Sequence, residues 1–153
     1  MDSVSRAEAS LLNLSLSGPP DRLLDSLIDA VIEKGVFVVA AFDPKRPNSE
    51  RFPTRRNGVL IVRAENMDQE NNTEFAAPGR RIVSSPSHNY QYMAGHSVAT
   101  AYTSGVLALL IQSQSQTRSD LSDALVDTQG RARYLSMHQL LENWHSKLVT
   151  DRG

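Results

Sequence analysis

The chain has 153 residues, which is enough for one domain with a hydrophobic core of its own. Its formal net charge of −1 gives no reason to expect nucleic acid or an anionic membrane as a partner. Because it contains no cysteine, disulfides, thiolate metal sites and a cysteine nucleophile are excluded. No apolar stretch predicts a membrane span, and residues 1–10 lack the apolar run of a signal peptide. These features are compatible with the cytoplasm but leave the compartment open.

Residues 11–41 predict a strand, a helix and a second strand. Residues 11–16 form a short apolar run that ends at a turn-forming Ser-Gly-Pro-Pro, which favours a strand. Asp21 is the expected N-cap of the helix and Gly35 the residue after its C-terminus, because apolar residues recur between them at helical spacing. Residues 36–41 are apolar without polar alternation, as in a strand buried on both faces. Two strands joined in this way pair in parallel with a right-handed crossover.

The middle of the chain predicts loops that alternate with short extended segments. Residues 42–58 form a polar loop interrupted by prolines, and its basic stretch 45–56 is expected to be solvated. The segments that follow are a third strand (59–62), an exposed acidic and amide-rich loop (63–73), a turn (74–79) and two short extended segments (82–84 and 89–94).

A Gly-His-Ser-Val-Ala-Thr sequence at residues 95–100 begins a small, apolar helix that extends to Ile111. This composition predicts a helix buried on most sides. Ser97 lies in its first turn, against the positive end of the helix dipole, where an oxyanion would be stabilised. A plain serine N-cap is the competing interpretation for such a residue.

The C-terminal part predicts further helices. Residues 113–119 are polar and of low complexity, a short helix follows around Leu125, and Ser136 is the expected N-cap of a last amphipathic helix. We therefore divide the chain into residues 1–112, which carry the sheet, and residues 113–153, a helical extension of the same domain.

Several segments, in one order, resemble motifs of the subtilisin-like serine peptidases (subtilases, peptidase S8 family). They are LSLSGP (14–19) for N-[ML]-S-L-G-G-P, VFVVAAFD (36–43) for VVVVAAAGN, VLIVRA (59–64) for VIAVGA, FAAPG with IVSS (75–79 and 82–85) for F-A-P-G…I-x-S-T, and GHSVAT with GVLALL (95–100 and 105–110) for G-T-S-M-A-T…G-V-A-A-L. The resemblance implies a three-layer α/β/α fold with a mainly parallel sheet. It covers the C-terminal half of such a catalytic domain, so its N-terminal strands would be missing.

The resemblance also assigns site residues. Ser97 matches the nucleophile, and Asp43 stands where the family has the Asn that donates to the oxyanion. The substrate groove is assigned to Ser15, Leu16, Ser17, Gly18, Ala40, Ala41 and Phe42.

Several of these residues depart from the family pattern. An ionised Asp43 cannot donate a hydrogen bond and would repel a developing oxyanion. Phe42 replaces a small glycine and is expected to narrow the pocket for the residue before the cleaved bond, and Ser17 replaces a groove glycine. Further replacements of motif residues are His96, Ala101 and Tyr102.

The catalytic Asp and His have no match in this sequence. In the family these residues precede the serine, upstream of the strand that begins here at Leu11, and the residues before Leu11 include no histidine. We therefore expect a serine endopeptidase fragment that is inactive as an isolated chain. The substrates that the resemblance implies are peptides or proteins, and a second chain could supply the N-terminal half. The local histidines (His88, His96, His138 and His145) are expected on surfaces or helix faces.

Two alternatives stay open at this point. An α/β-hydrolase would use Ser97 in a nucleophile elbow, with Asp123 or Asp127 and His138 or His145, although the strand before Ser97 is too polar for that fold. A degenerate subtilase would bind peptides without cleaving them. No cofactor is predicted: calcium sites are common in the family, but the acids and amides near Glu65 suggest a solvated loop.

Overall fold

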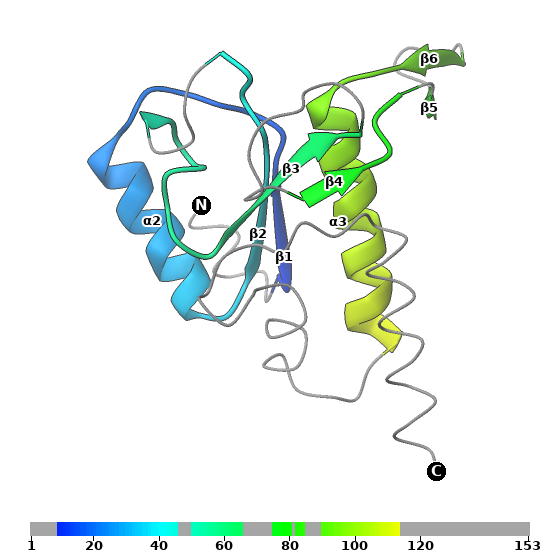
Figure 1. Cartoon of the computed structure of the whole chain (residues 1–153). Coiled ribbons are helices and arrows are strands. Elements are labelled where there is room, and N and C mark those ends of the chain that lie inside the picture. The colour runs from blue at the N-terminus through cyan, green and yellow to red at the C-terminus, as the bar shows by residue number, and fades with distance from the viewer. Residues whose placement is uncertain (1–8, 46–49, 66–74, 81, 85–89, 114–153) are drawn as a thin grey trace.

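The computed structural model describes residues 9–45, 50–65, 75–80, 82–84 and 90–113 (Figure 1). Helices α2 (Arg22–Glu33) and α3 (His96–Ser113) lie on opposite faces of a sheet, which gives three layers (Figure 1). The sheet consists of β1 (Leu11–Leu14), β2 (Phe37–Ala41), β3 (Val59–Ala64) and β4 (Phe75–Ala77). The predicted α/β fold is confirmed.

All neighbouring strands of this sheet are parallel, in the order β1-β2-β3-β4. Leu11 pairs with Phe37 and Val38 with Val59, so the carboxyl ends of β1, β2 and β3 lie at the same edge. The expected strand-helix-strand unit with parallel pairing is therefore present. β5 (Ile82–Ser84) and β6 (Gln91–Met93) form a separate antiparallel pair.

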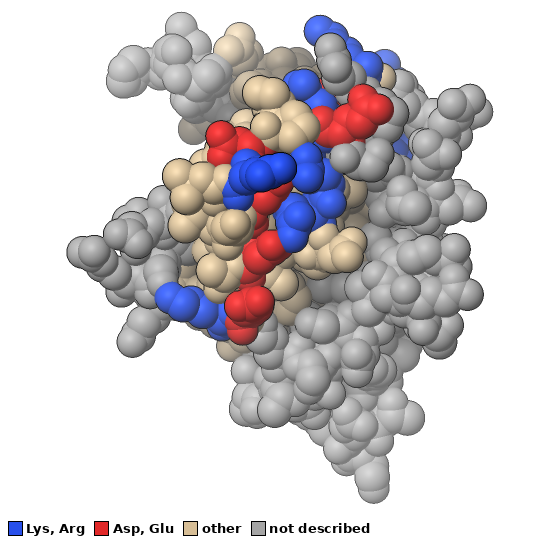
Figure 2. All heavy atoms as spheres, turned by 90° about the vertical axis from the view of Figure 1, so that its left-hand side faces the viewer, with Lys and Arg blue, Asp and Glu red and all other residues tan. Residues whose placement is uncertain are grey.

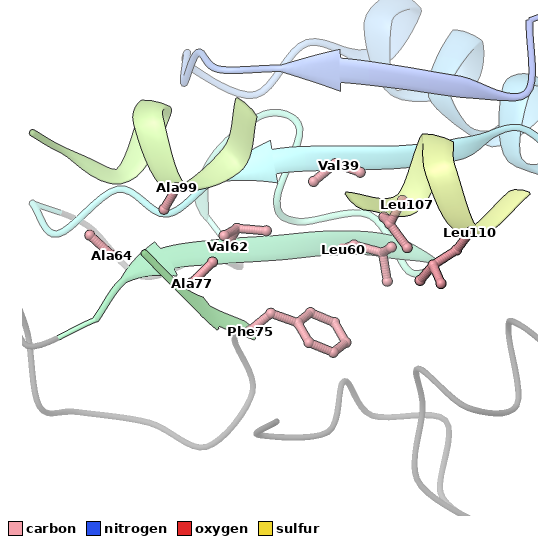
Figure 3. Close-up of a cluster of buried hydrophobic side chains, with 9 residues drawn as sticks. All are labelled: Val39, Leu60, Val62, Ala64, Phe75, Ala77, Ala99, Leu107 and Leu110. Carbon is pink, nitrogen blue, oxygen red and sulfur yellow. The ribbon is translucent and has the colours of Figure 1, made fainter. Parts of the chain in front are cut away.

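Alternate residues of the central strands pack against different helices. Val39, Leu60 and Val62 belong to the cluster under α3, together with Leu107 and Leu110 of that helix (Figure 3). Their neighbours along the strands form a second cluster against α2: Val38, Ala40 and Val59, with Ile28 and Val31. Since successive strand residues point to opposite faces, β2 must be apolar at every position, as its sequence indicated.

The helix that connects β1 to β2 has the predicted ends. Oδ1 of Asp21 accepts hydrogen bonds from the backbone N–H groups of Leu23 (2.9 Å) and Leu24 (3.0 Å). At the other end Gly35 has φ 80°, a left-handed conformation that glycine adopts without steric cost. Asp21 and Gly35 therefore form the two ends of α2, as the sequence predicted.

Three sequence-based expectations are wrong. Arg63 and Ala64 do not begin an exposed loop but are the buried end of β3. Residues 75–77 are not part of a turn but form the buried strand β4, which pairs with β3 through Val62 and Phe75. A strand of three residues is too short to show a pattern, and its position is set by pairing with β3. Helix α3 is less enclosed than expected, because Tyr102 is 40% and Leu109 66% exposed. Its uniformly apolar composition does not reveal which face the sheet covers.

The basic stretch after β2 is solvated only in part where the structure describes it: Lys45 and Arg55 are exposed, but residues 52–54 are buried. Phe52 and Thr54 are each 5% exposed, and the arginines around them are paired with aspartates. Nε of Arg55 lies 3.3 Å from Oδ2 of Asp25, and Arg56 forms an ion pair with Asp29. Figure 2 shows basic and acidic side chains side by side on the face that carries α2. These pairs attach the loop to α2.

The elements expected in the C-terminal extension, residues 114–153, lie outside the described residues, so the division at residue 112 stays a prediction. Within the described part of the chain, neither helix combines the length and apolar composition needed to cross a bilayer. The same part contains no group of three or more His, Cys, Asp or Glu side chains placed to hold a metal ion. Residues 66–73 of the predicted acidic and amide-rich loop lie outside the described residues as well.

Gly79 allows the start of α3 to approach the end of β3. A Cβ at Gly79 would lie 2.5 Å from Cβ of Ala64 and 2.9 Å from the carbonyl oxygen of Gly95. We expect Gly79→Ala to lower the free energy of unfolding by about 1–3 kcal/mol, the range for overpacking a core, measured as the shift of the urea midpoint. Gly105→Ala is the matched control, because nothing lies within 4 Å of its added Cβ and a helical alanine is favoured by about 0.5–1 kcal/mol. Equal effects of the two variants would contradict the close approach.

Candidate active site

Ser97 lies in the first turn of α3, and its side chain is exposed. The preceding Gly95 has φ 140°, and its N–H donates to the carbonyl oxygen of Gly79 at 2.8 Å. The carbonyl oxygen of Gly95 in turn accepts from the N–H groups of Val98 and Ala99. Ser97 is thereby held at the positive end of the helix dipole, where an anion is stabilised.

The hydroxyl of Ser97 contacts the segment that follows β1. Its Oγ donates to the carbonyl oxygen of Ser15 at 3.4 Å. The hydroxyl of Ser15 lies 2.8 Å from Oδ1 of Asn13 and 3.3 Å from the carbonyl oxygen of Ser97. Because a hydroxyl has one proton, the shorter contact with Asn13 is the stronger one. The proposed nucleophile and the first predicted groove residue therefore lie side by side.

A series of hydrogen bonds holds the end of β1 against the start of α3. Nδ2 of Asn13 donates to Oγ of Ser104 at 3.0 Å, and that hydroxyl donates to the carbonyl oxygen of Thr100 at 2.9 Å. Thr100 in turn donates to the carbonyl oxygen of His96 at 2.8 Å. Asn13 therefore joins β1 to α3 and orients the turn that carries Ser97. Sequence reasoning did not single out Asn13, because its partner is 91 residues away in the sequence.

Asp43 follows β2, and hydrogen bonds and an ion pair hold its carboxylate. Oδ1 accepts from the backbone N–H of Lys45 at 3.0 Å, and Oδ2 accepts from the hydroxyl of Ser17 at 2.8 Å and from Nε of Arg51 at 3.1 Å. The N–H of Lys45 lowers the pKa of Asp43 most, burial acts in the opposite direction, and Ser17 and Arg51 lower it further. The carboxyl is therefore ionised at neutral pH, and its oxygens only accept hydrogen bonds.

The other predicted groove residues lie at the carboxyl ends of β1 and β2. Leu16 is 49% exposed, whereas Gly18 is half-buried, and the backbones of Gly18 and Phe52 exchange hydrogen bonds of 3.0 and 3.1 Å. Ala41 is buried at the end of β2, and Ala40 packs in the core cluster against α2. The side chain of Ala40 therefore does not line an open surface.

Phe42 packs against His96. The ring centroids lie 5.3 Å apart with the planes at 84°, an edge-to-face contact. Nδ1 of His96 accepts the backbone N–H of Ala64 at 3.0 Å, so a neutral ring carries its proton on Nε2. His96 is the first residue of α3 and is half-buried, in keeping with the expectation of a histidine on a helix face. His88, His138 and His145 lie outside the described residues.

Arg51 is a further site residue that sequence reasoning missed. It comes from the loop between β2 and β3, and its Nε reaches both Asp43 and the hydroxyl of Ser17 at 2.9 Å. The basic character of the loop was visible in the sequence, but nothing there indicated which arginine contacts Ser17 and Asp43.

Comparison with known proteins connects this arrangement to one family. A family model described as the subtilase family matches residues 8–146. M-protease of Shouchella clausii (strain KSM-K16) is 33% identical over 112 residues, which cover 65% of this chain and 29% of that protein. The extracellular basic protease of Dichelobacter nodosus is 31% identical over 147 residues, which cover 80% of this chain and 24% of that protein. The chain thus spans less than a third of the length of these two relatives.

Two solved structures have the same fold. A mutant of the protease domain of PatA aligns with a TM-score of 0.68 at 19% identity, covering 88% of this chain and 58% of that one. The prenylagaramide maturation protease PagA aligns with a TM-score of 0.69 at 22% identity, covering 92% of this chain and 64% of that one.

The α/β-hydrolase interpretation is wrong. In a nucleophile elbow the serine follows a strand of the central sheet. Here the strand before Ser97 is β6, which is exposed and pairs with β5 outside the parallel sheet. The match to the subtilase family model also argues against an α/β-hydrolase.

Proposed function

Because this chain belongs to the subtilase family, we propose that it is the nucleophile-bearing part of a serine endopeptidase domain, with Ser97 as the nucleophile. The observation that carries this proposal is the position of the Ser97 hydroxyl. It is exposed in the first turn of α3 and lies 3.4 Å from the carbonyl oxygen of Ser15, beside the predicted groove.

The proposed reaction is acyl transfer. Oγ of Ser97 attacks the peptide carbonyl, its proton passes to a base, and the C–N bond breaks as that proton reaches the leaving amine. Water then hydrolyses the acyl-enzyme and releases the second product. The N-terminal end of α3 stabilises the oxyanion of each tetrahedral intermediate.

We propose that the base and its orienting carboxylate come from a segment that carries the family's Asp and His motifs. His96 does not fit the role of base. Its Nδ1 accepts the N–H of Ala64, and its Nε2 is protonated in the neutral ring, so neither nitrogen can take the Ser97 proton while that bond persists. This supports the expectation that residues 1–153 alone are inactive.

The sheet offers a place for such a segment. Among the described residues, β1 lies at one edge and pairs only with β2. Leu11, Leu12 and Leu14 are half-buried along this edge. A further strand would complete the backbone hydrogen bonding of β1, and without it an apolar edge favours association with another chain. The partner we propose is therefore a polypeptide that adds a strand to β1.

Peptide binding without cleavage is a second candidate function. It is favoured by the ionised Asp43, which stands where the family places an oxyanion donor. A carboxylate there cannot donate, and its charge opposes the transition state.

The direct test is covalent labelling of Ser97. We mix the chain with the part of M-protease that precedes its match to this chain, add a fluorophosphonate probe, and locate the label by peptide mass spectrometry. We expect labelling at Ser97 that Ser97→Ala abolishes. Ser26→Ala is the control, because Oγ of Ser26 bonds the carbonyl oxygen of Arg22 within α2. Labelling that persists in Ser97→Ala would refute the assignment.

A further inference from the structure

Ser17, Asp43 and Arg51 form a closed polar cluster where the sequence predicts the substrate groove. The hydroxyl of Ser17 lies 2.8 Å from Oδ2 of Asp43, and Nε of Arg51 lies 2.9 Å from that hydroxyl and 3.1 Å from the same carboxylate oxygen. Every pair within the cluster is therefore in hydrogen-bonding contact. The cluster bridges the segment after β1, which carries Ser17, and the segment after β2, which carries Asp43.

The backbone holds Arg51 in this position. The next residue, Phe52, is 5% exposed and exchanges two backbone hydrogen bonds with Gly18, the residue after Ser17. Arg51 is thus fixed beside Ser17 by the bridge between their neighbours. The position of its guanidinium beside Ser17 therefore does not depend on the ion pair alone.

The cluster is partly shielded from water. The side chains of Arg51 and Asp43 are 21% and 13% exposed. Opposite charges that lose part of their hydration are costly to separate, because each then lacks both water and its partner. A ligand that separates Arg51 from Asp43 must therefore replace both interactions.

We propose that Ser17, Asp43 and Arg51 restrict the substrate residue before the cleaved bond to small, uncharged side chains such as glycine, alanine and serine. A large side chain between the two segments would have to break the bridge. A charged side chain would lose hydration there without gaining an unpaired opposite charge, because the carboxylate and the guanidinium already neutralise each other. This inference rests on the proposed function, since it assigns the substrate class of the same groove.

Peptide binding tests the inference without requiring catalysis. The full chain, as the Ser97→Ala variant, is titrated with acetyl-Ala-Ala-Ala-Xaa-amide peptides, and Kd is measured from amide chemical shifts. We expect the Kd for Xaa = Ala to be at least 10-fold lower than those for Phe, Asp and Lys. Because Ser97 is absent, failure of the proposed acyl transfer would leave this preference intact.

Opening the bridge should change the preference. We expect the triple variant S17G, D43N and R51G to raise the affinity for the Phe peptide, relative to that for the Ala peptide, at least 10-fold. R51G alone should change this ratio in the same direction. Arg56→Gln is the control, because Arg56 pairs with Asp29 on α2. Equal affinities of the Ser97→Ala chain for the Ala and Phe peptides, an unchanged ratio in both further variants, or no binding of any peptide would each overturn the proposal. Tighter binding of the Asp peptide that is lost in R51G would also overturn the proposal, because it would show that Arg51 recognises acidic side chains.

Discussion

The 153-residue chain alone is expected to cleave casein no faster than its Ser97→Ala variant. A serine hydroxyl is a poor nucleophile without a base, and Oγ of Ser97 donates to a backbone carbonyl rather than to an imidazole. In subtilisin, a member of the same family, removing the triad costs about 10⁶ in kcat, and the remaining site accelerates the reaction only about 10³–10⁴-fold over water. That residual rate is too slow for a casein assay to detect.

Under the proposed function, a segment that carries the family's Asp and His motifs should confer activity when it is added in trans. We expect the part of M-protease that precedes its match to this chain to raise the cleavage rate by several orders of magnitude. The same addition should slow amide exchange along β1, because a new strand would occupy its edge. Ser97→Ala in the mixture is the control, since it retains the partner interface but lacks the nucleophile.

One outcome would contradict the proposal directly. Clear cleavage by a monodisperse monomer of the isolated chain, abolished by Ser97→Ala, would show that the chain contains its own base. His138→Ala and His145→Ala would then identify it. Protected β1 amides without restored cleavage would instead favour the function of peptide binding alone.

The part of the fold that the sequence predicted well is the part with local signals. Asp21 and Gly35 define α2 through capping chemistry that depends on a few neighbouring residues. Strand β2 was recognisable because both of its faces are buried. β4 was missed because its place depends on pairing with β3, and the exposed face of α3 because Leu109 and Leu107 are equally apolar in the sequence.

The candidate site, too, was predictable only where the sequence carries a local signal. The sequence alone placed Ser97 at the start of a helix. It also showed that Asp43 replaces the Asn that donates a hydrogen bond to the oxyanion in the family. The contacts that fix these residues were not predictable. Arg51 meets Ser17 across 34 positions of sequence, and Asn13 meets Ser104 across 91. Such partners follow from the parallel sheet, which brings distant segments to one edge.

Asp43→Asn is expected to raise kcat of the assembled enzyme about 10-fold or more. One oxyanion donor is worth about 10²–10³ in kcat, a value measured in subtilisin itself. Asn supplies an N–H donor where the wild type has a carboxylate, and its oxygen can still accept from the N–H of Lys45. The expected increase in kcat is smaller than the full effect of one oxyanion donor, because Arg51 loses its ion pair.

The control for this substitution is Asp29→Asn, which also removes an Asp–Arg pair, but on α2 with Arg56. Casein hydrolysis by the assembled enzyme gives the rates of both variants and the wild type. Because the pKa of Asp43 lies below its ordinary value of 3.8, the wild-type carboxyl stays ionised across the neutral and mildly alkaline range. The ratio of variant to wild-type kcat should therefore be constant over that range. An unchanged or lower kcat in Asp43→Asn would mean that another group holds the oxyanion, and a ratio that falls with decreasing pH would mean that Asp43 becomes neutral and donates.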